Sequence, residues 1–127
     1  MIELAVATPE SELVREAVSE VQIPALGGYL GVLPGHAALV SILGTGALSY
    51  TAGGKRTYFA VQGGFVEVLP DRVRVLADVA EPGTAIDLSR ARQELAEAQR
   101  QLANAEPAAG LAAVALAEAR IAAASGR

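Results

Sequence analysis

Two kinds of hydrophobic spacing divide the chain into two parts. Before residue 87, short apolar or alternating runs of strand length recur between turn signals. Runs of this kind are typical of β-strands. They cover residues 2–7, 13–23, 39–43, 47–51, 57–61, 65–69 and 73–77. Because many short strands must bury two apolar faces against each other, the pattern favours a sandwich or a flattened barrel.

Turn-forming residues separate several of the expected strands. Ala52-Gly53-Gly54-Lys55 predicts a hairpin turn, since glycine accepts the backbone angles that a tight turn needs. Leu69-Pro70-Asp71-Arg72 indicates a second turn. Glu81-Pro82-Gly83-Thr84 is expected to join the sheet to the C-terminal part of the chain, because neither Pro nor Gly propagates a strand.

From Asp87 onward the apolar residues recur every three or four positions, which is the spacing of a helix. Leu and Ala alternate along this heptad seam, at Leu88, Ala91, Leu95, Ala98, Leu102 and Ala105. The seam predicts a helix over 87–105 with Asp87 as its N-cap. Pro107 suits the first turn of a new helix, so Glu106-Pro107 is expected to be a hinge before a second helix over 108–124. Its apolar stripe would be Leu111, Val114, Ala117 and Ile121.

Two helices joined by so short a link should fold back as an antiparallel hairpin. The predicted fold class is therefore α+β: an N-terminal antiparallel β-sandwich over 1–84 and a C-terminal two-helix hairpin over 85–127. Alanine side chains bury little area, and burial stabilises by roughly 25 cal/mol per Å². The hairpin is thus expected to be weakly held and able to come apart.

Composition supports the same division. Eleven of the 13 Gly, five of the six Pro and all five aromatic residues precede Asp87, whereas 15 of the 41 residues from Asp87 onward are Ala. Gly, Pro, Val and aromatic residues favour strands and turns, and Ala favours helix.

Charge and cysteine content exclude several classes of function. Ten Lys and Arg against 14 Asp and Glu give a net charge of −4, the wrong sign for neutralising nucleic-acid phosphates. No apolar run of about 18 residues is present to insert into a bilayer. The N-terminus lacks the basic start of a secretory signal, so a cytoplasmic location is the default. Without cysteine there are no disulfides or thiolate sites.

The residues that carry chemistry are few. His36 is the one histidine, and no Gly-x-Ser-x-Gly motif accompanies it. We therefore favour a shaped turn over catalysis at Leu33-Pro34-Gly35-His36, and we assign no catalytic or metal-binding residues. The glycines of Gly27-Gly28-Tyr29-Leu30-Gly31 lack the ending of a phosphate-binding loop and are expected to shape turns and edges.

The start of the first expected helix allows two interpretations. Unpaired N–H groups of a first helical turn lie beside Arg90 and Arg92, and such a turn can receive an anion. Alternatively, Asp87 caps the helix and the arginines are solvated. From the residues by themselves the second interpretation is favoured.

Several motifs, in order, resemble the epsilon subunits of bacterial F-type ATP synthases, the counterparts of the mitochondrial delta subunit. The first motif is Gly31-Val32-Leu33-Pro34-Gly35-His36, and the second is Gly63-Gly64-Phe65-Val66-Glu67-Val68. Val73-Arg74-Val75-Leu76-Ala77-Asp78 and Ile86-Asp87-Leu88-Ser89-Arg90-Ala91 come after them. The resemblance extends over nearly the whole chain.

This resemblance implies a rotor-stalk subunit with no active site. Its sandwich would dock on the gamma subunit and the c-ring and help couple proton flow to catalysis elsewhere, as a peripheral protein on the cytoplasmic face of the bacterial inner membrane. Partner contacts are expected at Tyr29, Leu30 and His36. In the family the position of Tyr29 is often acidic, so a charged contact to the ring is not expected there.

The resemblance also implies a regulatory hairpin. In the family this arm lies folded on the sandwich or extends into the alpha/beta catalytic head, where it inhibits ATP hydrolysis. Some bacterial members bind ATP in the folded state through Ile/Leu-Asp-x-x-Arg-Ala, which Ile86, Asp87, Arg90 and Ala91 match. Glu81 and Arg120 are expected as further nucleotide contacts by position.

Departures from the family pattern temper these expectations. After Pro107 the only bases are Arg120 and Arg127, which predicts weak inhibition through salt bridges. No cofactor is expected to be required, and ATP would act as a regulatory ligand. Two other hypotheses are a self-contained ATP-sensing protein whose hairpin closes on the nucleotide, and, as a remote third, a small enzyme that depends on His36.

Overall fold

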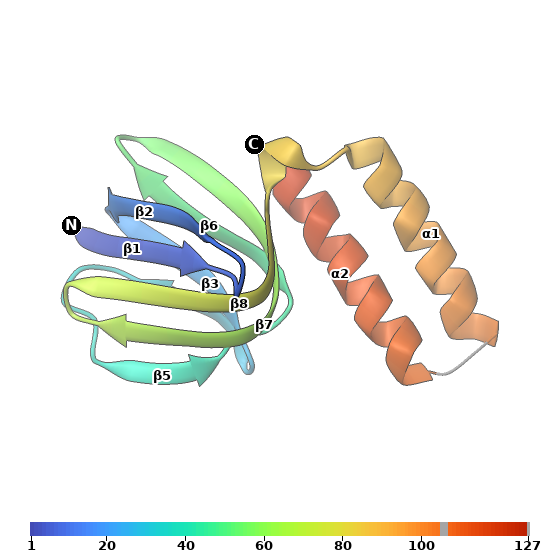
Figure 1. Cartoon of the computed structure of the whole chain (residues 1–127), viewed down its shortest axis with the longest axis horizontal. Helices are drawn as coiled ribbons and strands as arrows, with labels where there is room; N and C mark the ends of the chain where they lie inside the picture. The colour runs from blue at the N-terminus through green and yellow to red at the C-terminus, as the bar shows by residue number, and fades with distance from the viewer. Residues whose placement is uncertain (105–106, 127) are drawn as a thin grey trace.

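A computed structural model describes residues 1–104 and 107–126, and it confirms the order of a β-sandwich followed by two helices (Figure 1). The strands are β1 Ile2–Ala7, β2 Glu12–Val18, β3 Glu20–Ala25, β4 Gly28–Val32, β5 Leu39–Ile42, β6 Gly46–Ala52, β7 Lys55–Leu69 and β8 Arg72–Pro82. A short 3₁₀ turn, η1 Gly83–Ala85, leads into α1 Leu88–Asn104 and α2 Pro107–Gly126.

The eight strands form one sheet that folds over on itself. Its order is β2-β1-β8-β7-β6-β3-β4, and β5 pairs with β7 beside this path. The first half of β7 pairs with β6 and its last residues pair with β5, so β7 belongs to both layers. The pairing is antiparallel throughout these strands except between β1 and β8, which run parallel, in contrast to the all-antiparallel prediction.

The sandwich core consists of inward-facing Val, Ile and Leu side chains from both layers. Ile2, Leu4, Ile23 and Leu48 are fully buried within it. Tyr50 packs near Phe59 at the edge of this core, with ring centroids 6.4 Å apart, and burial raises the pKa of its phenol. Strand alternation thus provides one stable body that carries the rest of the chain.

A glycine pair bends β7 where two separate strands were predicted. The expected strands 57–61 and 65–69 are one strand that passes through Gly63 and Gly64. Gly64 has a φ of 108°, and a Cβ atom there would overlap the carbonyl oxygen of Leu76 on β8. A side chain is therefore excluded at the bend, and the bend lets β7 pair with β6 before it and β5 after it.

Three other strand boundaries differ from the prediction. The run 13–23 is two strands, because the chain turns a corner at Ser19, whose N–H and hydroxyl both donate to the Thr51 carbonyl oxygen. The segment 28–32, expected to be turn and edge, is strand β4 and pairs with β3. Glu81 and Pro82 still belong to β8, so the joint begins at Gly83. Strand pairing here overrides local turn propensity.

Helix α1 confirms most of the predicted seam. Ala91 and Ala98 are buried, and the larger Leu88, Leu95 and Leu102 are half-buried. Asp87 caps the helix as expected, because its Oδ1 accepts a hydrogen bond from the Arg90 N–H at 3.1 Å. The last seam position, Ala105, and Glu106 of the expected hinge lie outside the described residues.

The predicted apolar stripe of the second helix was wrong at its first position. Leu111 is 58% exposed, whereas Ala119, Ala123 and Ala124 are buried. The reason is that α2 has two neighbours: it lies between α1 and the sandwich (Figure 1) and contacts β6 and β7 as well as α1. A single stripe cannot describe a helix that is packed on two sides.

Candidate functional site

A small apolar cluster, separate from the sandwich core, lies where the hairpin joins the sandwich. Ile86 and Ala91 are buried there together with Ala60 of β7 and the α2 alanines Ala119, Ala123 and Ala124. Half-buried Tyr58 and Leu88 pack against them. The side chains of Ile86 and Ala91 are therefore buried, and they pack the start of α1 against β7 and α2.

Close backbone approach brings α2 onto the sandwich. A Cβ atom at Gly83 would overlap the carbonyl oxygen of Ala123, and one at Gly126 would lie 2.8 Å from the Tyr58 ring. Only glycine at these positions lets the end of α2 approach so closely. Since the neighbouring side chains are mostly alanine, the contact buries little apolar area for its length.

Arg120 of α2 links three elements through ion pairs. Its Nη1 pairs with Glu94 of α1, and its Nη2 donates to Glu81 Oε2 of β8 at 3.3 Å. Its Nε lies 3.0 Å from Glu81 Oε1. The Arg120 side chain is 18% exposed, against 35% for Glu81 and 44% for Glu94. We call Glu81, Arg120 and Glu94 the Arg120 triad.

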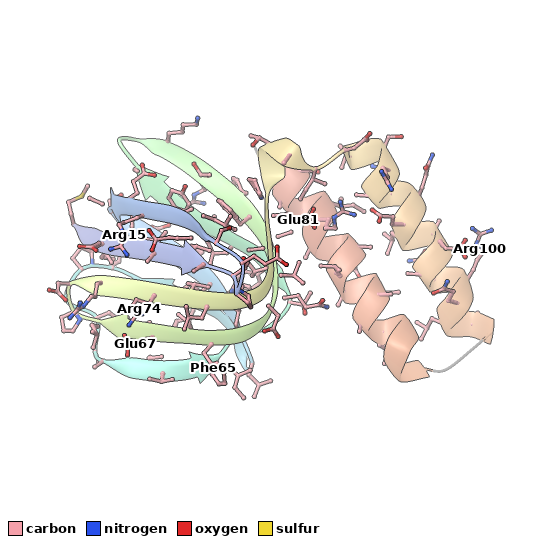
Figure 2. All side chains as sticks on the ribbon, in the orientation of Figure 1. Arg15, Phe65, Glu67, Arg74, Glu81 and Arg100 are labelled. Atoms are coloured by element: carbon pink, nitrogen blue, oxygen red, sulfur yellow. The ribbon has the colours of Figure 1, made fainter. Side chains whose placement is uncertain are left out.

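Figure 2 shows Glu81 on the side of the sandwich that faces α2, far from Arg15 and Glu67. Among the residues that the structure describes, the Glu81–Arg120 pair is the one ion pair between the hairpin and the sandwich. Water screens a partly buried ion pair less than an exposed one, and loss of one partner leaves the other charge uncompensated. The Arg120 triad therefore adds an ion pair to a contact between α2 and the sandwich that otherwise consists mainly of alanine side chains.

A groove of about 670 Å³ runs between α1 and α2 beside the triad. Three arginines and two glutamates line it: Arg90, Arg100, Arg120, Glu94 and Glu97. Its volume falls within the range of about 300–1,000 Å³ that is usual for small-molecule sites. We call this feature the helix groove.

The structure brings together part of the predicted nucleotide set. Arg90 and Arg120 line the helix groove, and Glu81 contacts Arg120. Asp87 lies at the helix start, where its carboxylate accepts the Arg90 N–H. Ile86 and Ala91 are buried in the apolar cluster at the joint and do not line the groove. The role of these residues toward a ligand stays a prediction.

The predicted partner residues do not form one site. Tyr29 lies near the start of β4, is 61% exposed, and accepts a hydrogen bond from the Ala47 N–H at 3.0 Å. Leu30 packs against the sandwich core. His36 lies beyond the other end of β4, in a turn where its Nδ1 is 2.7 Å from the Ala37 carbonyl oxygen. Their contacts to partners stay predictions.

An exposed apolar patch on the sandwich was not predicted from the sequence. Phe65 of β7 lies directly opposite Ile42 of β5 and Leu76 of β8, and Val40 lies nearby. All four side chains are at least half exposed. We call Val40, Ile42, Phe65 and Leu76 the outer patch. Its signal in the sequence was an apolar residue at an outward position, as in Leu76 between the inward Val75 and Ala77.

Charged residues, among them Arg15, Glu67 and Arg74, lie on the same sheet face (Figure 2). Arg15 donates to both carboxylate oxygens of Glu12 at 2.8 Å, and these hydrogen bonds lower the pKa of Glu12. Arg74 lies 3.9 Å from Glu67, next to the hollow that Phe65 and Leu76 line. The outer patch is thus an apolar surface with a polar border, which is typical of protein interfaces.

Within residues 1–104 and 107–126, no three His, Asp or Glu side chains are grouped to hold a metal ion. Among the described helices, none combines the length and the hydrophobicity of a membrane-spanning segment.

The structure defines a β-sandwich protein with a helical hairpin docked on its side, and sequence comparison identifies its family. Residues 1–83 match the model of the ATP synthase delta/epsilon chain β-sandwich domain. The chain therefore belongs to the delta/epsilon chain family of ATP synthase.

The curated proteins that are similar to this chain include ATP synthase epsilon chains. The ATP synthase epsilon chain of Solibacter usitatus is 57% identical over 125 residues, which covers 95% of this chain and 93% of the relative. The ATP synthase epsilon chain of Koribacter versatilis is 43% identical over 98 residues, or 77% of this chain and 69% of the relative. The first alignment includes the hairpin, so the likeness is not confined to the sandwich.

Solved structures show the same architecture. A chain of the Euglena gracilis mitochondrial ATP synthase, solved as OSCP/F1/c-ring, matches with a TM-score of 0.81 and 27% identity over 98% of this chain and 80% of that chain. A chain from the central stalk and c-ring of the Tetrahymena thermophila mitochondrial ATP synthase has a TM-score of 0.56 at 17% identity, over 72% and 69% of the two chains. The second match supports the fold.

Replacing Glu81 with Gln should loosen the docking of α2. The variant keeps the size of the side chain and removes the charge that pairs with Arg120, a partly exposed pair worth about 1 kcal/mol. Amide hydrogen exchange along α2 should become about fivefold faster, while exchange in the core strands is unchanged. Glu67→Gln, which removes the partner of Arg74 on the outer face, is the matched control. Equal protection of α2 in both variants would show that the Arg120 triad does not hold the hairpin.

Proposed function

We propose that the chain is a rotor subunit that links the gamma subunit to the c-ring of a proton-translocating F-type ATP synthase. It has no catalytic site of its own and acts as a peripheral protein on the cytoplasmic face of the bacterial inner membrane. Membership of the delta/epsilon family supports this role, and so does the likeness to a chain in an F1/c-ring assembly.

The outer patch is the observation that carries the docking proposal. Phe65, Leu76 and Ile42 form a continuous apolar row across three strands, and each is 50–59% exposed. Leaving such a row in water is unfavourable, so a partner that covers it gains free energy. The gamma subunit is the proposed partner, because it is the family's rotor neighbour that accepts the rigid sandwich.

The c-ring contact is proposed at the tip of the β3–β4 hairpin. Leu26 is 74% exposed at this tip, and the exposed Tyr29 lies just after it in the chain. The Tyr29 hydroxyl is held by the Ala47 N–H, which fixes the ring on the surface. An uncharged aromatic side chain here supports an apolar contact to the ring loops in place of a charged one.

The hairpin is proposed to regulate ATP hydrolysis by leaving the sandwich and entering the alpha/beta catalytic head. Its contact to the sandwich consists mainly of small side chains, and one ion pair joins the two parts within the described residues. An interface of this kind has a small free-energy difference between its docked and released states, and a ligand that prefers one state shifts the population.

ATP is the proposed regulatory ligand of the docked state. The helix groove places Arg90 and Arg120 on facing helices, and arginine is suited to phosphate oxygens because its N–H groups form a planar fork. Arg90 belongs to the family's Ile/Leu-Asp-x-x-Arg-Ala motif together with Ile86, Asp87 and Ala91, and Glu81 and Arg120 are proposed as further contacts by position. A ligand that bridges α1 and α2 would stabilise the folded hairpin.

Replacing Phe65 with Ser should weaken binding to the gamma subunit by about 30-fold, since a buried aromatic side chain at the centre of an interface contributes about 2 kcal/mol or more. Isothermal calorimetry or surface plasmon resonance with purified gamma measures the change. Leu111→Ser is the control: Leu111 of α2 is as exposed as Phe65, at 58% against 59%, but lies outside the outer patch. Equal loss in both variants, or no loss in either, would contradict docking through the outer patch.

Replacing Arg90 with Ala should weaken ATP binding at least tenfold, because a charge-assisted hydrogen bond to phosphate contributes about 1.5–3 kcal/mol. Calorimetric titration of the full chain with ATP tests this. Arg92→Ala removes a neighbouring exposed arginine that does not line the helix groove and should change the affinity less than about twofold. If both variants bind ATP as the unmodified chain does, the nucleotide does not use the helix groove.

A further inference from the structure

Two glutamate carboxylates of the chain itself lie in the helix groove. Glu94 and Glu97 both line it, and each pairs with an arginine that lines it too. The two pairs differ in geometry: Glu97 pairs with Arg100 one turn along the same helix, whereas Glu94 pairs with Arg120 across the groove. A phosphate entering the groove meets both carboxylates.

Arg120 is already engaged by two carboxylates. Its Nη1 pairs with Glu94, and its Nη2 and Nε face Glu81 at 3.3 and 3.0 Å. An anionic ligand that approaches Arg120 from the groove therefore competes with a carboxylate for a donor nitrogen. Of the two carboxylates that pair with Arg120, Glu94 lines the groove, whereas Glu81 contacts Arg120 from the sandwich side.

We propose that Glu94 is an internal competitor that occupies the phosphate-binding edge of Arg120 and sets the affinity of the helix groove for a polyphosphate. The inference rests on the proposed function of the groove as a nucleotide site. On binding, a phosphate oxygen takes the place of the Glu94 carboxylate at Nη1, and Glu94, whose side chain is 44% exposed, turns to solvent. The pair between Arg120 and Glu81 is retained, so the hairpin stays fastened to the sandwich.

The alternative is that Glu94 is only a structural link between the helices. In that case its loss separates α1 from α2, and ATP binding weakens or does not change. The competitor role predicts the opposite sign, because removing the Glu94 charge both releases Nη1 and removes repulsion of the ligand. The direction of the change in affinity thus separates the two roles.

The test is calorimetric titration of the full chain and its Glu94→Gln variant with ATP and, separately, with inorganic tripolyphosphate. The variant should bind both ligands about five- to tenfold more tightly, since the competition concerns the phosphates. Glu97→Gln is the matched control: it changes the net charge by the same amount in the same groove but frees Arg100. Because the Glu97–Arg100 pair is exposed to water, with side chains 55% and 72% exposed, it holds Arg100 only weakly, and the affinity of this variant should change less than about twofold.

Three results would overturn the inference in different ways. Weaker or unchanged binding by Glu94→Gln, with the unmodified chain binding ATP, refutes the competitor role and leaves the nucleotide site standing. Equal tightening by Glu94→Gln and Glu97→Gln shows a general charge effect and refutes the specific role of Glu94. Failure of all three proteins to bind either ligand refutes the nucleotide site itself, and the inference with it. Circular dichroism and α2 hydrogen exchange confirm that each variant is folded.

Discussion

The contact of α2 with the sandwich is the interaction that places the hairpin, and the proposed regulation depends on it. Helix α1 is held mainly through α2, so the whole hairpin is fastened by the alanine surface of α2 and by Arg120. Gly83 and Gly126 allow the close approach, and the small side chains keep the gain in burial modest. The sandwich has a separate core, mostly of branched side chains, to which the hairpin contributes no residue. One part of the chain therefore has a core of large side chains, whereas the other is attached to it mainly through small ones.

Because the sandwich and the hairpin are held by different kinds of contact, they are suited to different tasks. A stiff sandwich with an exposed apolar row is suited to permanent docking in a rotor, as proposed for the outer patch and gamma. A hairpin with a small docking free energy is suited to regulation, since a single ligand or partner can reverse its position. The proposed nucleotide groove lies between the two helices and next to the Arg120 triad, so a ligand there acts on the interface that decides the state.

Much of the fold could be predicted from the sequence because its signals are local. The change of hydrophobic spacing at Asp87 indicated a β-sheet part followed by a helical part. Aspartate is a common N-cap residue, and Asp87 does cap α1. The errors arose where tertiary contacts decide. Strand β4 is glycine-rich yet pairs with β3, β7 continues through Gly63 and Gly64, and α2 is so uniformly apolar that its two buried faces could not be separated, which is why Leu111 was misplaced. In the site, a motif identified Arg90, but the triad partner Glu94 and the outer patch depend on register between distant segments.

The central claim is that the hairpin is a releasable arm and not a fixed part of the body. The most direct measurement compares ATP hydrolysis by the alpha/beta/gamma catalytic head after addition of the full chain or of a chain ending at Ile86. A releasable arm predicts that the full chain lowers the hydrolysis rate at low ATP, that the inhibition decreases as ATP rises, and that the shortened chain binds gamma without inhibiting. Equal hydrolysis rates with both chains at every ATP concentration would contradict it.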